Sequence, residues 1–424
     1  MKRLLFLFLI LPFMACANGE VRVEKKPVPR VITGAENLLL STDFWQKIEG
    51  KQIGIVSNQT SIVGPNKVHL VDTLLARGIK IKTIFCPEHG FRGQAEAGAV
   101  IASGVDRQTG LPVVSLYGAN KKPLPNQMKG LDVMLFDLQD VGCRFYTYIS
   151  TLHYVMEACA EAGVPLMVLD RPNPNGHYVD GPVLEPQYQS FVGMHPVPIV
   201  YGMTIGEYAL MIQGERWLWM TSKANQWVRK YSDEEYDSRS LLMLSVVPLV
   251  NYTHNTRYKL PVAPSPNLQT SQSISLYPHL CLFEGTNISV GRGTDSPFEM
   301  VGSPSYKATT NDLPDSVNRN FQFTPRCIKG VSENPPFKGQ VCKGIDLRKV
   351  KAANKFDLTY ILEMYQATPK TNFFMRNNFF DKLAGTASLR LQIGLGQSEK
   401  QIRESWASKL NDFKKIRSKY LLYP

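Results

Sequence analysis

Residues 51–172 alternate between short apolar runs and segments with helical spacing, and this alternation restricts the fold more than any other feature. Strands joined by helical crossovers are typical of a parallel sheet that is covered by helices. The apolar runs predict strands at 52–57, 79–86, 112–117, 133–138 and 165–169. We therefore expect an α/β domain with a parallel sheet in the first half of the chain.

Polar side chains follow the ends of most of these strands: Asn58, Gln59, Glu88, Asp137, Gln139, Asp140, Asp170 and Arg171. Because parallel strands end at the same edge of a sheet, we expect these side chains to converge where open α/β sheets bind ligands. The second strand runs into Pro-Glu-His-Gly-Phe-Arg-Gly at residues 87–93, whose glycines allow close approach of the backbone to a ligand. Glu88 is therefore the first candidate for a functional carboxylate.

The length of 424 residues suggests more than one domain. An irregular, proline-rich segment at 251–266 separates the parallel-sheet half from a second half that mixes strands and helices. We place the boundary in this segment, which gives domains at 31–255 and 256–424. The last helix is predicted to begin with a capping box of Ser398 and Gln401.

The first residues indicate export. Lys2 and Arg3 precede an apolar run at 4–14 that is too short to span a bilayer but fits a secretion signal. Residues 1–17 are interpreted as a signal peptide that ends in a small-x-small cleavage site. Alternatively, the sequence around Cys16 is a loose lipobox, so that Cys16 becomes lipidated and 18–30 forms a tether. We expect a periplasmic protein or an outer-membrane-anchored lipoprotein, with membrane contact only through a lipid on Cys16.

The formal net charge of +12 comes from scattered basic residues, which favours a solvated surface over nucleic-acid binding. A basic surface also suits an anionic polymer such as the cell wall. Cys327 and Cys342 lie in a loop-rich stretch and are suited to pair in an oxidising periplasm.

The sequence gives no support to nucleotide, metal or serine chemistry. The first strand runs into Ser-Asn-Gln-Thr-Ser at 57–61, which lacks the glycine fingerprint and a Walker lysine. Metal-ligand spacings and a GxSxG elbow are also missing from the sequence. We therefore expect no cofactor and no metal, and carboxylate chemistry remains.

Several carboxylates are candidates for that chemistry: Glu88, Asp137, Asp140, Asp170, Glu284, Asp295 and Glu299. Glycoside hydrolysis needs a protonated acid at the leaving oxygen, and nearby aromatic residues would supply apolar walls. Asp137 and Asp140 are also suited to capping the next helix, and His89 to a structural hydrogen bond.

At these motifs the chain resembles the NamZ-type exo-β-N-acetylmuramidases, a bacterial family that was long known as a domain of unknown function. The matching strings lie at 87–93, 137–142, 144–148, 170–176, 181–184, 264–268, 284–287, 291–294 and 380–386. The resemblance extends from about residue 32 to the end of the chain. It implies a Rossmann-like catalytic domain and a smaller mixed α/β domain, with the active-site cleft between them.

The resemblance further implies an exo-acting glycoside hydrolase that releases N-acetylmuramic acid from the non-reducing end of peptidoglycan fragments. Muramic acid–glucosamine oligosaccharides would be its substrates in cell-wall turnover. The key acid of the family falls on Glu88. Glu299 stands where glutamine is common, which makes it a poor catalytic candidate.

We assign Glu88 as the general acid, and we take His89 and Asp140 as further catalytic candidates. The expected substrate-binding residues are Asn58, Arg92, Gln139, Arg144, Tyr146, Arg171, Asn267, Glu284 and Arg292. Arginines would bind the lactyl carboxylate of muramic acid, because a guanidinium matches a carboxylate bidentately. Two alternatives stay open: a non-catalytic, muropeptide- or glycan-binding surface lipoprotein, and a hydrolase of a wall ester or amide.

Overall fold

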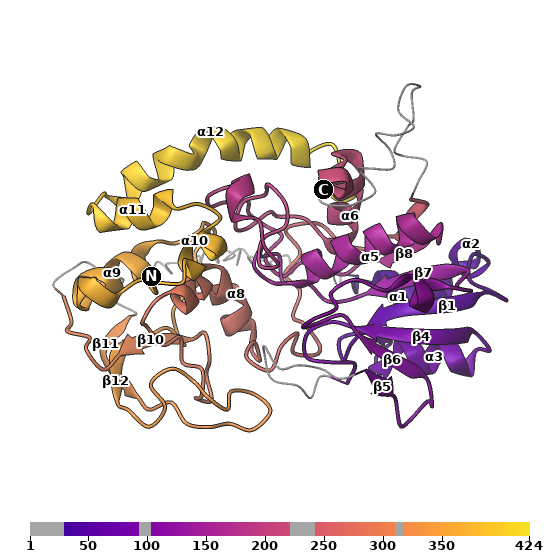
Figure 1. The fold of residues 1–424 in the computed structure, drawn as a ribbon, viewed down its shortest axis with the longest axis horizontal. Helices are drawn as coiled ribbons and strands as arrows, with labels where there is room; N and C mark the ends of the chain where they lie inside the picture. Colours follow the sequence, from indigo (N-terminus) through magenta and orange to yellow (C-terminus); the bar gives the residue numbers. More distant parts are fainter. Residues whose placement is uncertain (1–28, 93–102, 221–241, 310–316) are drawn as a thin grey trace, which may run out of the picture. The chain divides into compact units, whose positions relative to one another are not determined.

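A seven-stranded, mainly parallel sheet organises the first half of the protein (Figure 1). The computed structural model describes residues 29–92, 103–220, 242–309 and 317–424. In sheet order the strands are β5 (Gly104–Val105), β6 (Pro112–Ser115), β4 (Lys80–Cys86), β1 (Gln52–Ser57), β7 (Val133–Asp137), β8 (Leu166–Leu169) and β9 (Leu244–Val247). Of these seven strands, β5 alone is antiparallel to its neighbour. The five predicted strands are confirmed, whereas β5 and β9 have no counterpart in the prediction.

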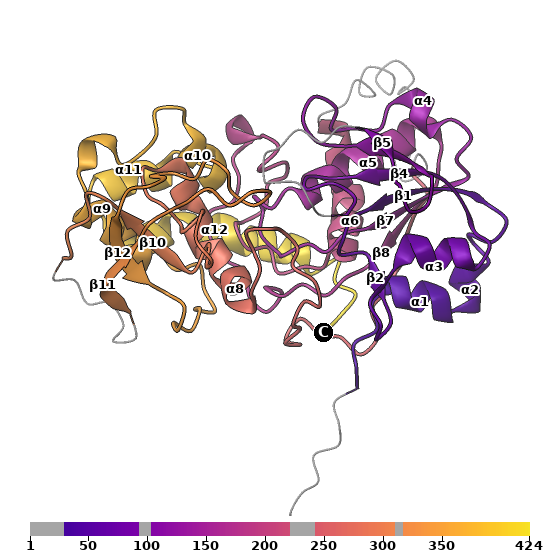
Figure 2. The same ribbon diagram turned by 90° about the horizontal axis from the view of Figure 1, so that it is seen from below.

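Helices cover both faces of this sheet (Figure 2). One face carries α1 (Gly34–Leu40), α2 (Thr42–Trp45) and α3 (Leu70–Ala76), and the other carries α4 (Pro125–Met128), α5 (Tyr148–Ala162) and α6 (Ile205–Gly214). Successive side chains of a strand point to opposite faces. In β7, Leu135 accordingly packs with the α1–α3 layer and Phe136 with the α5–α6 layer. The central strands β1, β4 and β7 are mainly apolar because most of their residues are buried between the two helix layers.

The direction of chain winding reverses at the centre of the sheet. β1 connects to β4 through α3 on one face, whereas the neighbouring strand β7 connects to β8 through α5 on the other. Loops that leave the carboxyl ends of two such strands diverge and open a crevice between them. Glu88 follows β4, which is paired with β1, so it lies beside this crevice.

The second half contains a smaller, antiparallel sheet of β10 (Met300–Ser303), β12 (Cys342–Asp346) and β11 (Asn318–Phe323), in that order. Its helices are α8 (Ser271–Leu280), α9 (Thr359–Ala367), α10 (Phe379–Ala384), α11 (Ser388–Gly394) and α12 (Glu399–Arg417). A large mainly parallel sheet followed by a small antiparallel one confirms the predicted mixed α/β class. Residues 31–424 pack as one compact unit, and the division at 255/256 stays a prediction.

The C-terminal helix α12 returns the chain to the first half of the protein. It begins with the predicted capping box of Ser398 and Gln401. Figure 1 shows α12 running from beside α11 toward α6. Arg417, the last residue of α12, donates to the carbonyl of Gly202, and beyond the helix the Tyr423 hydroxyl donates to Asp170 at 2.6 Å. The last residues therefore tie the second half to the large sheet.

The structure bears on the expected cysteine pair but not on the expected export signal. Cys327 is exposed and Cys342 is buried, and both are free thiols, so the possible disulfide is not formed. The predicted signal peptide, Cys16 and most of the tether lie outside the described residues. Within the described part of the chain, no helix has the length and apolar character needed to cross a membrane.

Arg144 is a fully buried cation that joins the two halves. Its guanidinium donates to the carbonyls of Pro182 (2.8 Å), Val197 (2.7 Å) and Leu383 (2.9 Å), and the last of these belongs to α10. Burial lowers the pKa of Arg144 to about 9. The structure thus gives Arg144 a structural position, and its expected contact with substrate stays a prediction.

Arg144→Met is expected to lower the free energy of unfolding by about 3 kcal/mol or more, because three buried carbonyls lose their donor. Denaturant unfolding of the purified protein measures this loss. The control is Arg326→Ala, since Arg326 is 61% exposed in its pair with Asp295. That change should alter stability by about 1 kcal/mol or less. Equal, small effects of both substitutions would contradict the structural position of Arg144.

Candidate active site

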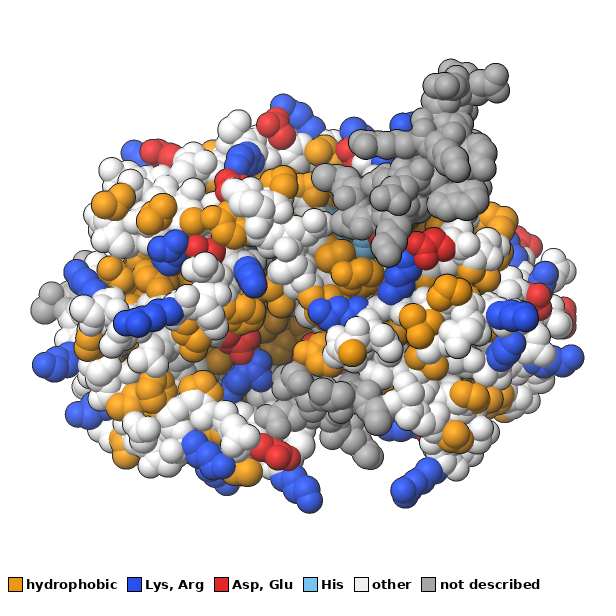
Figure 3. Space-filling model, in the orientation of Figure 1, with side chains coloured by type: hydrophobic (Ala, Val, Ile, Leu, Met, Phe, Trp, Pro, Cys, Tyr) orange, Lys and Arg blue, Asp and Glu red, His pale blue; other side chains and the backbone are white. Residues whose placement is uncertain are grey.

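A cavity of about 380 Å³ opens at the carboxyl edge of the large sheet, between residues of both halves of the chain. The space-filling view shows a hollow near the middle of one face, with hydrophobic side chains in its depth and charged side chains near its rim (Figure 3). Polar and aromatic residues line the cavity: Glu88, His89, Tyr117, Phe145, Tyr146, Thr147, Tyr148, Asn267, Tyr277, Glu284, Arg292, Phe298, Ser332 and Asn334. We call this cavity the edge pocket.

A sharp turn after β4 brings Glu88 to the edge pocket. The amide of Gly90 donates to the carbonyl of Pro87 at 3.1 Å, and His89 adopts a φ of +75°, which is uncommon for a residue other than glycine. Unusual backbone of this kind is found preferentially at functional sites. The turn therefore supports a functional reading of the Glu88–His89 pair.

Hydroxyl groups hold the Glu88 carboxylate. Thr147 precedes the first residue of α5, and its Oγ1 donates to Glu88 Oε2 at 3.1 Å. Tyr117 also forms a side-chain hydrogen bond with Glu88. The pKa of Tyr117 is raised above its usual range, mainly by burial and to a smaller extent by the charge of Glu88 and by this hydrogen bond. The carboxylate is thereby fixed in one orientation toward the pocket.

Interlocked aromatic rings form a wall of the edge pocket. The Tyr146 ring meets Tyr148 edge-on with 4.7 Å between ring centroids, and Tyr277 in turn meets Phe145 at 5.3 Å and Phe298 at 5.1 Å. Edge-to-face packing of this kind holds rings in fixed positions. Flat, rigid rings beside a carboxylate suit a ligand with apolar faces, such as a sugar ring.

Glu284 and Arg292 supply the charged groups from the second half. Arg292 Nε donates to Glu284 Oε1 at 2.5 Å, and the guanidinium lies over the Phe298 ring, 5.2 Å from its centroid. Both side chains are partly open, at 21% and 23% exposure. Among the described residues, neither Nη group of Arg292 has a hydrogen-bond partner. A carboxylate on a ligand could therefore bind both.

The structure brings six of the predicted site residues together in the edge pocket: Glu88, His89, Tyr146, Asn267, Glu284 and Arg292. Their catalytic and binding roles stay predictions. Tyr146 also donates to the carbonyl of Pro264 at 2.8 Å, which ties a pocket wall of the first half to the second half.

Other predicted site residues form a buried hydrogen-bond network at the ends of the strands. Asn58 donates to the Tyr148 hydroxyl at 2.7 Å, and Gln139 donates to the carbonyl of Pro172 at 2.7 Å. Arg171 pairs with Asp137 through two hydrogen bonds of 2.6 and 2.8 Å. Asn58, Gln139 and Arg171 therefore hold the loops in place and are not among the residues that line the edge pocket, so their expected contacts with substrate stay a prediction.

Arg92 and Asp140 also lie apart from the lining residues. Arg92 binds Asp106 at 2.9 Å and Asp72 at 3.5 Å, so two carboxylates already engage its charge. Asp140 is buried, and its Oδ2 accepts hydrogen bonds from the Tyr201 hydroxyl and from the amide of Gly142. Burial raises the pKa of Asp140 to about 6. Its position fits a structural carboxylate better than a catalytic one.

Sequence reasoning missed several pocket residues, among them Tyr117, Thr147, Tyr277 and Asn334. Thr147 could have been predicted, because it belongs to the matching string at 144–148 and directly precedes a predicted helix. Asn334 lies in an irregular loop and carries no such signal.

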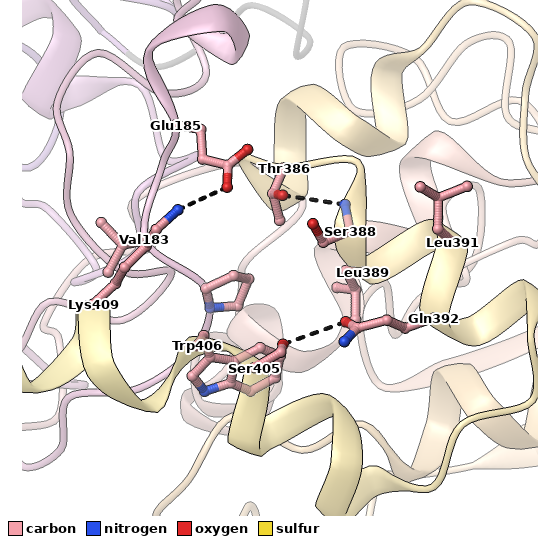
Figure 4. Close-up of a pocket in the computed structure, with 11 residues that line it drawn as sticks. Val183, Glu185, Thr386, Ser388, Leu389, Leu391, Gln392, Ser405, Trp406 and Lys409 are labelled. Atoms are coloured by element: carbon pink, nitrogen blue, oxygen red, sulfur yellow. Dashed lines mark hydrogen bonds and ion pairs between the residues drawn. The ribbon is translucent and has the colours of Figure 1, made fainter.

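A second cavity of about 280 Å³ lies between α11, α12 and residues 182–185 (Figure 4). Lys409 Nζ pairs there with Glu185 Oε1 at 2.8 Å, and the Ser405 hydroxyl donates to Gln392 at 3.4 Å. Because these polar groups bind one another, we assign no ligand to this cavity.

The edge pocket places carboxylates among aromatic rings at the edge of an α/β fold, an arrangement that glycoside hydrolases use. Family models describe the N-terminal and C-terminal parts of the exo-β-N-acetylmuramidase NamZ, and they match residues 53–272 and 275–423. The chain belongs to the NamZ family of exo-β-N-acetylmuramidases, which confirms the resemblance.

Individual relatives agree with this family. The peptidoglycan β-N-acetylmuramidase NamZ of Bacillus subtilis (strain 168) is 39% identical over 421 residues, which cover 96% of this chain and 95% of the relative. Two DUF1343 family proteins from Bacteroides fragilis NCTC 9343 have solved crystal structures. One is 40% identical with a TM-score of 0.78 over 93% of this chain and 99% of the relative. The other is 28% identical with a TM-score of 0.75 over 93% of this chain and 100% of the relative.

Asp140→Asn is expected to change how stability depends on pH. The folded-state pKa of Asp140, about 6, lies above that of an unfolded aspartate, about 3.9. The native state therefore holds a proton between these values that the unfolded state lacks, and wild-type stability falls as the pH rises through this window. Relative to the wild type, the variant should gain up to ~3 kcal/mol between pH 4 and 7.

Denaturant unfolding of both proteins at several pH values measures this difference. Asparagine keeps an acceptor for Tyr201 and Gly142, so the fold should persist. Parallel pH profiles of the two proteins would rule out the buried, proton-binding state of Asp140.

Proposed function

We propose that the chain is an exo-acting glycoside hydrolase that releases N-acetylmuramic acid from the non-reducing end of peptidoglycan fragments. The name of the Bacillus subtilis relative and the names of both family models support this function. One observation carries it for this chain: a single pocket holds Glu88 on the sheet side together with the Glu284–Arg292 pair of the second half.

Glu88 is the general acid in this proposal. A glycosidic bond breaks when the leaving oxygen receives a proton, and a carboxylic acid fixed beside that oxygen supplies it. The hydroxyls of Thr147 and Tyr117 hold the Glu88 carboxyl in one orientation. The acid therefore loses little conformational freedom when it meets the leaving oxygen. The aromatic wall reduces access of water to the reacting atoms.

Arg292 recognises the lactyl carboxylate of muramic acid. Its Nε is engaged with Glu284, which orients the guanidinium and leaves the two Nη groups for a ligand. Muramic acid differs from glucosamine by this anionic side arm, so a guanidinium beside the sugar discriminates between them. The preferred substrates are then muramic acid–glucosamine oligosaccharides.

Export follows from the nature of such a substrate, which lies outside the cytoplasm. We propose that residues 1–17 act as a signal peptide and that Cys16 is the site of lipid attachment. Incorporation of labelled fatty acid into the wild type, and its loss in Cys16→Ser, would support the anchor. Secretion of a wild-type protein that carries no fatty-acid label would support simple cleavage of the signal peptide without lipid attachment.

The decisive experiment incubates the purified protein with a muramic acid–glucosamine disaccharide and identifies the products. Release of free N-acetylmuramic acid supports the hydrolase. Tight binding with no product over hours would instead support a muropeptide-binding protein. Cleavage restricted to an ester or amide of a wall fragment would support a different hydrolase.

Glu88→Gln is expected to lower kcat by about 100-fold or more, because glutamine keeps the shape of the side chain but has no acidic proton. Release of N-acetylmuramic acid from the disaccharide measures the rate, and thermal unfolding confirms the fold. The matched control is Glu299→Gln, since Glu299 is buried against Thr270 and does not line the edge pocket. Near-normal turnover by Glu88→Gln would refute the assignment.

Arg292→Met is expected to raise KM for a β-N-acetylmuramide by about 10- to 100-fold, which corresponds to the loss of a charge-assisted hydrogen-bond pair. A β-N-acetylglucosaminide lacks the lactyl carboxylate, so the smaller activity toward it should change little. Because the substitution leaves Glu284 without its partner, the double variant Arg292→Met/Glu284→Gln serves as the control. Equal losses on the two substrates would contradict carboxylate recognition by Arg292.

A further inference from the structure

Asn267 lines the edge pocket, and its side chain carries a buried acceptor that has no hydrogen-bond partner among the described residues. The residue is 1% exposed and lines the pocket beside Ser265 and Leu268. Its backbone amide donates to the Ser265 hydroxyl at 3.3 Å, which fixes the local turn. Among the described residues, its side-chain Oδ1 is buried and has no hydrogen-bond partner.

The orientation of the Asn267 amide follows from its neighbour. Its Nδ2 donates to the carbonyl of Val331 at 3.0 Å. A backbone carbonyl accepts hydrogen bonds and cannot donate them, so rotating the amide by half a turn would set two oxygens against each other. Oδ1 is thereby fixed as the atom that faces away from Val331.

A buried acceptor without a donor is unfavourable in the free protein, and a ligand that supplies the donor removes this penalty. The two carboxylates of the edge pocket have partners of their own: Glu88 accepts from Thr147, and Glu284 accepts from Arg292. Asn267 Oδ1 is therefore suited to distinguish a ligand that carries a donor at this point from one that does not.

We propose that Asn267 Oδ1 accepts the N–H of the acetamido group of the substrate, which makes Asn267 a specificity-determining residue for 2-acetamido sugars. This inference rests on the proposed function and adds the recognised group. An N–H can only donate and Oδ1 can only accept, so the pair is matched in one direction. A site built for a donor strongly rejects an analogue that lacks it.

The substrate could offer a second N–H, in the amide that joins a peptide to the lactyl group. The test therefore uses 4-nitrophenyl β-N-acetylmuramide, which carries no peptide. Its partner is the analogue in which the acetamido N–H is replaced by oxygen, as a 2-O-acetyl ester. These two compounds differ only at the atom that Asn267 is proposed to contact.

The kcat/KM of both compounds is measured for the wild type and for Asn267→Leu, which keeps the side-chain size but removes the acceptor. We expect Asn267→Leu to lower kcat/KM for the amide by about 10-fold or more and to leave the ester within about threefold. Equal losses on both compounds would overturn the proposal.

Asn334→Leu is the matched control, because Asn334 carries the same side chain and lines the same pocket. It should not change the ratio between amide and ester; a change as large as that of Asn267→Leu would also overturn the proposal. If Asn267→Leu does not fold, Asn267→Ser takes its place, with a smaller loss of discrimination expected.

A binding measurement separates this proposal from the proposed function. Calorimetry compares free N-acetylmuramic acid with its 2-O-acetyl analogue on the wild type and on Asn267→Leu. A wild type that cleaves neither 4-nitrophenyl glycoside but binds free N-acetylmuramic acid more tightly than its 2-O-acetyl analogue, with this preference lost in the variant, would refute the hydrolase and keep the role of Asn267. Cleavage of the amide with unaltered discrimination in the variant would refute the role of Asn267 alone.

Discussion

The carboxyl ends of β1, β4 and β7 lie side by side near the place where the winding of the sheet reverses. The loops that follow these strands have no neighbouring strand, so side chains must form the hydrogen bonds that their buried backbone groups need. Most side chains at this edge serve that requirement. The Arg171–Asp137 pair and the bonds from Asn58 and Gln139 close the loops on one another. Glu88 is the exception, because its turn directs it into a cavity that the second half completes.

The edge pocket therefore depends on how firmly the second half is held. Arg144 joins three carbonyls of the two halves, Tyr146 donates to Pro264, and the C-terminal residues return to the large sheet through Tyr423. All of these contacts are buried, so they persist without competition from water. A small displacement of the second half would move Arg292 and Asn267 relative to Glu88, and catalysis is sensitive to such shifts.

The sequence allowed the large sheet to be predicted because strands buried on both faces are mainly apolar and alternate along the chain with segments of helical spacing. β9 was not predicted although residues 242–250 are mainly apolar; the strand itself has four residues, and three of them are only partly buried. Glu88 could be found because its motif combines a strand end with glycines. Arg92 could not be excluded, because its partners Asp72 and Asp106 lie on separate segments that only the fold brings together.

Burial decides what a charged pair can do, and burial is not readable from residue type. Arg171–Asp137 and Arg292–Glu284 are both arginine–carboxylate pairs with hydrogen bonds near 2.6 Å. The first is 3% and 0% exposed, so a ligand that displaced either partner would leave an uncompensated buried charge, which costs about 3–5 kcal/mol. The second is 21% and 23% exposed, and solvent compensates its charges when a ligand carboxylate approaches. The same chemistry thus holds the structure together at one place and leaves a binding group available at the other.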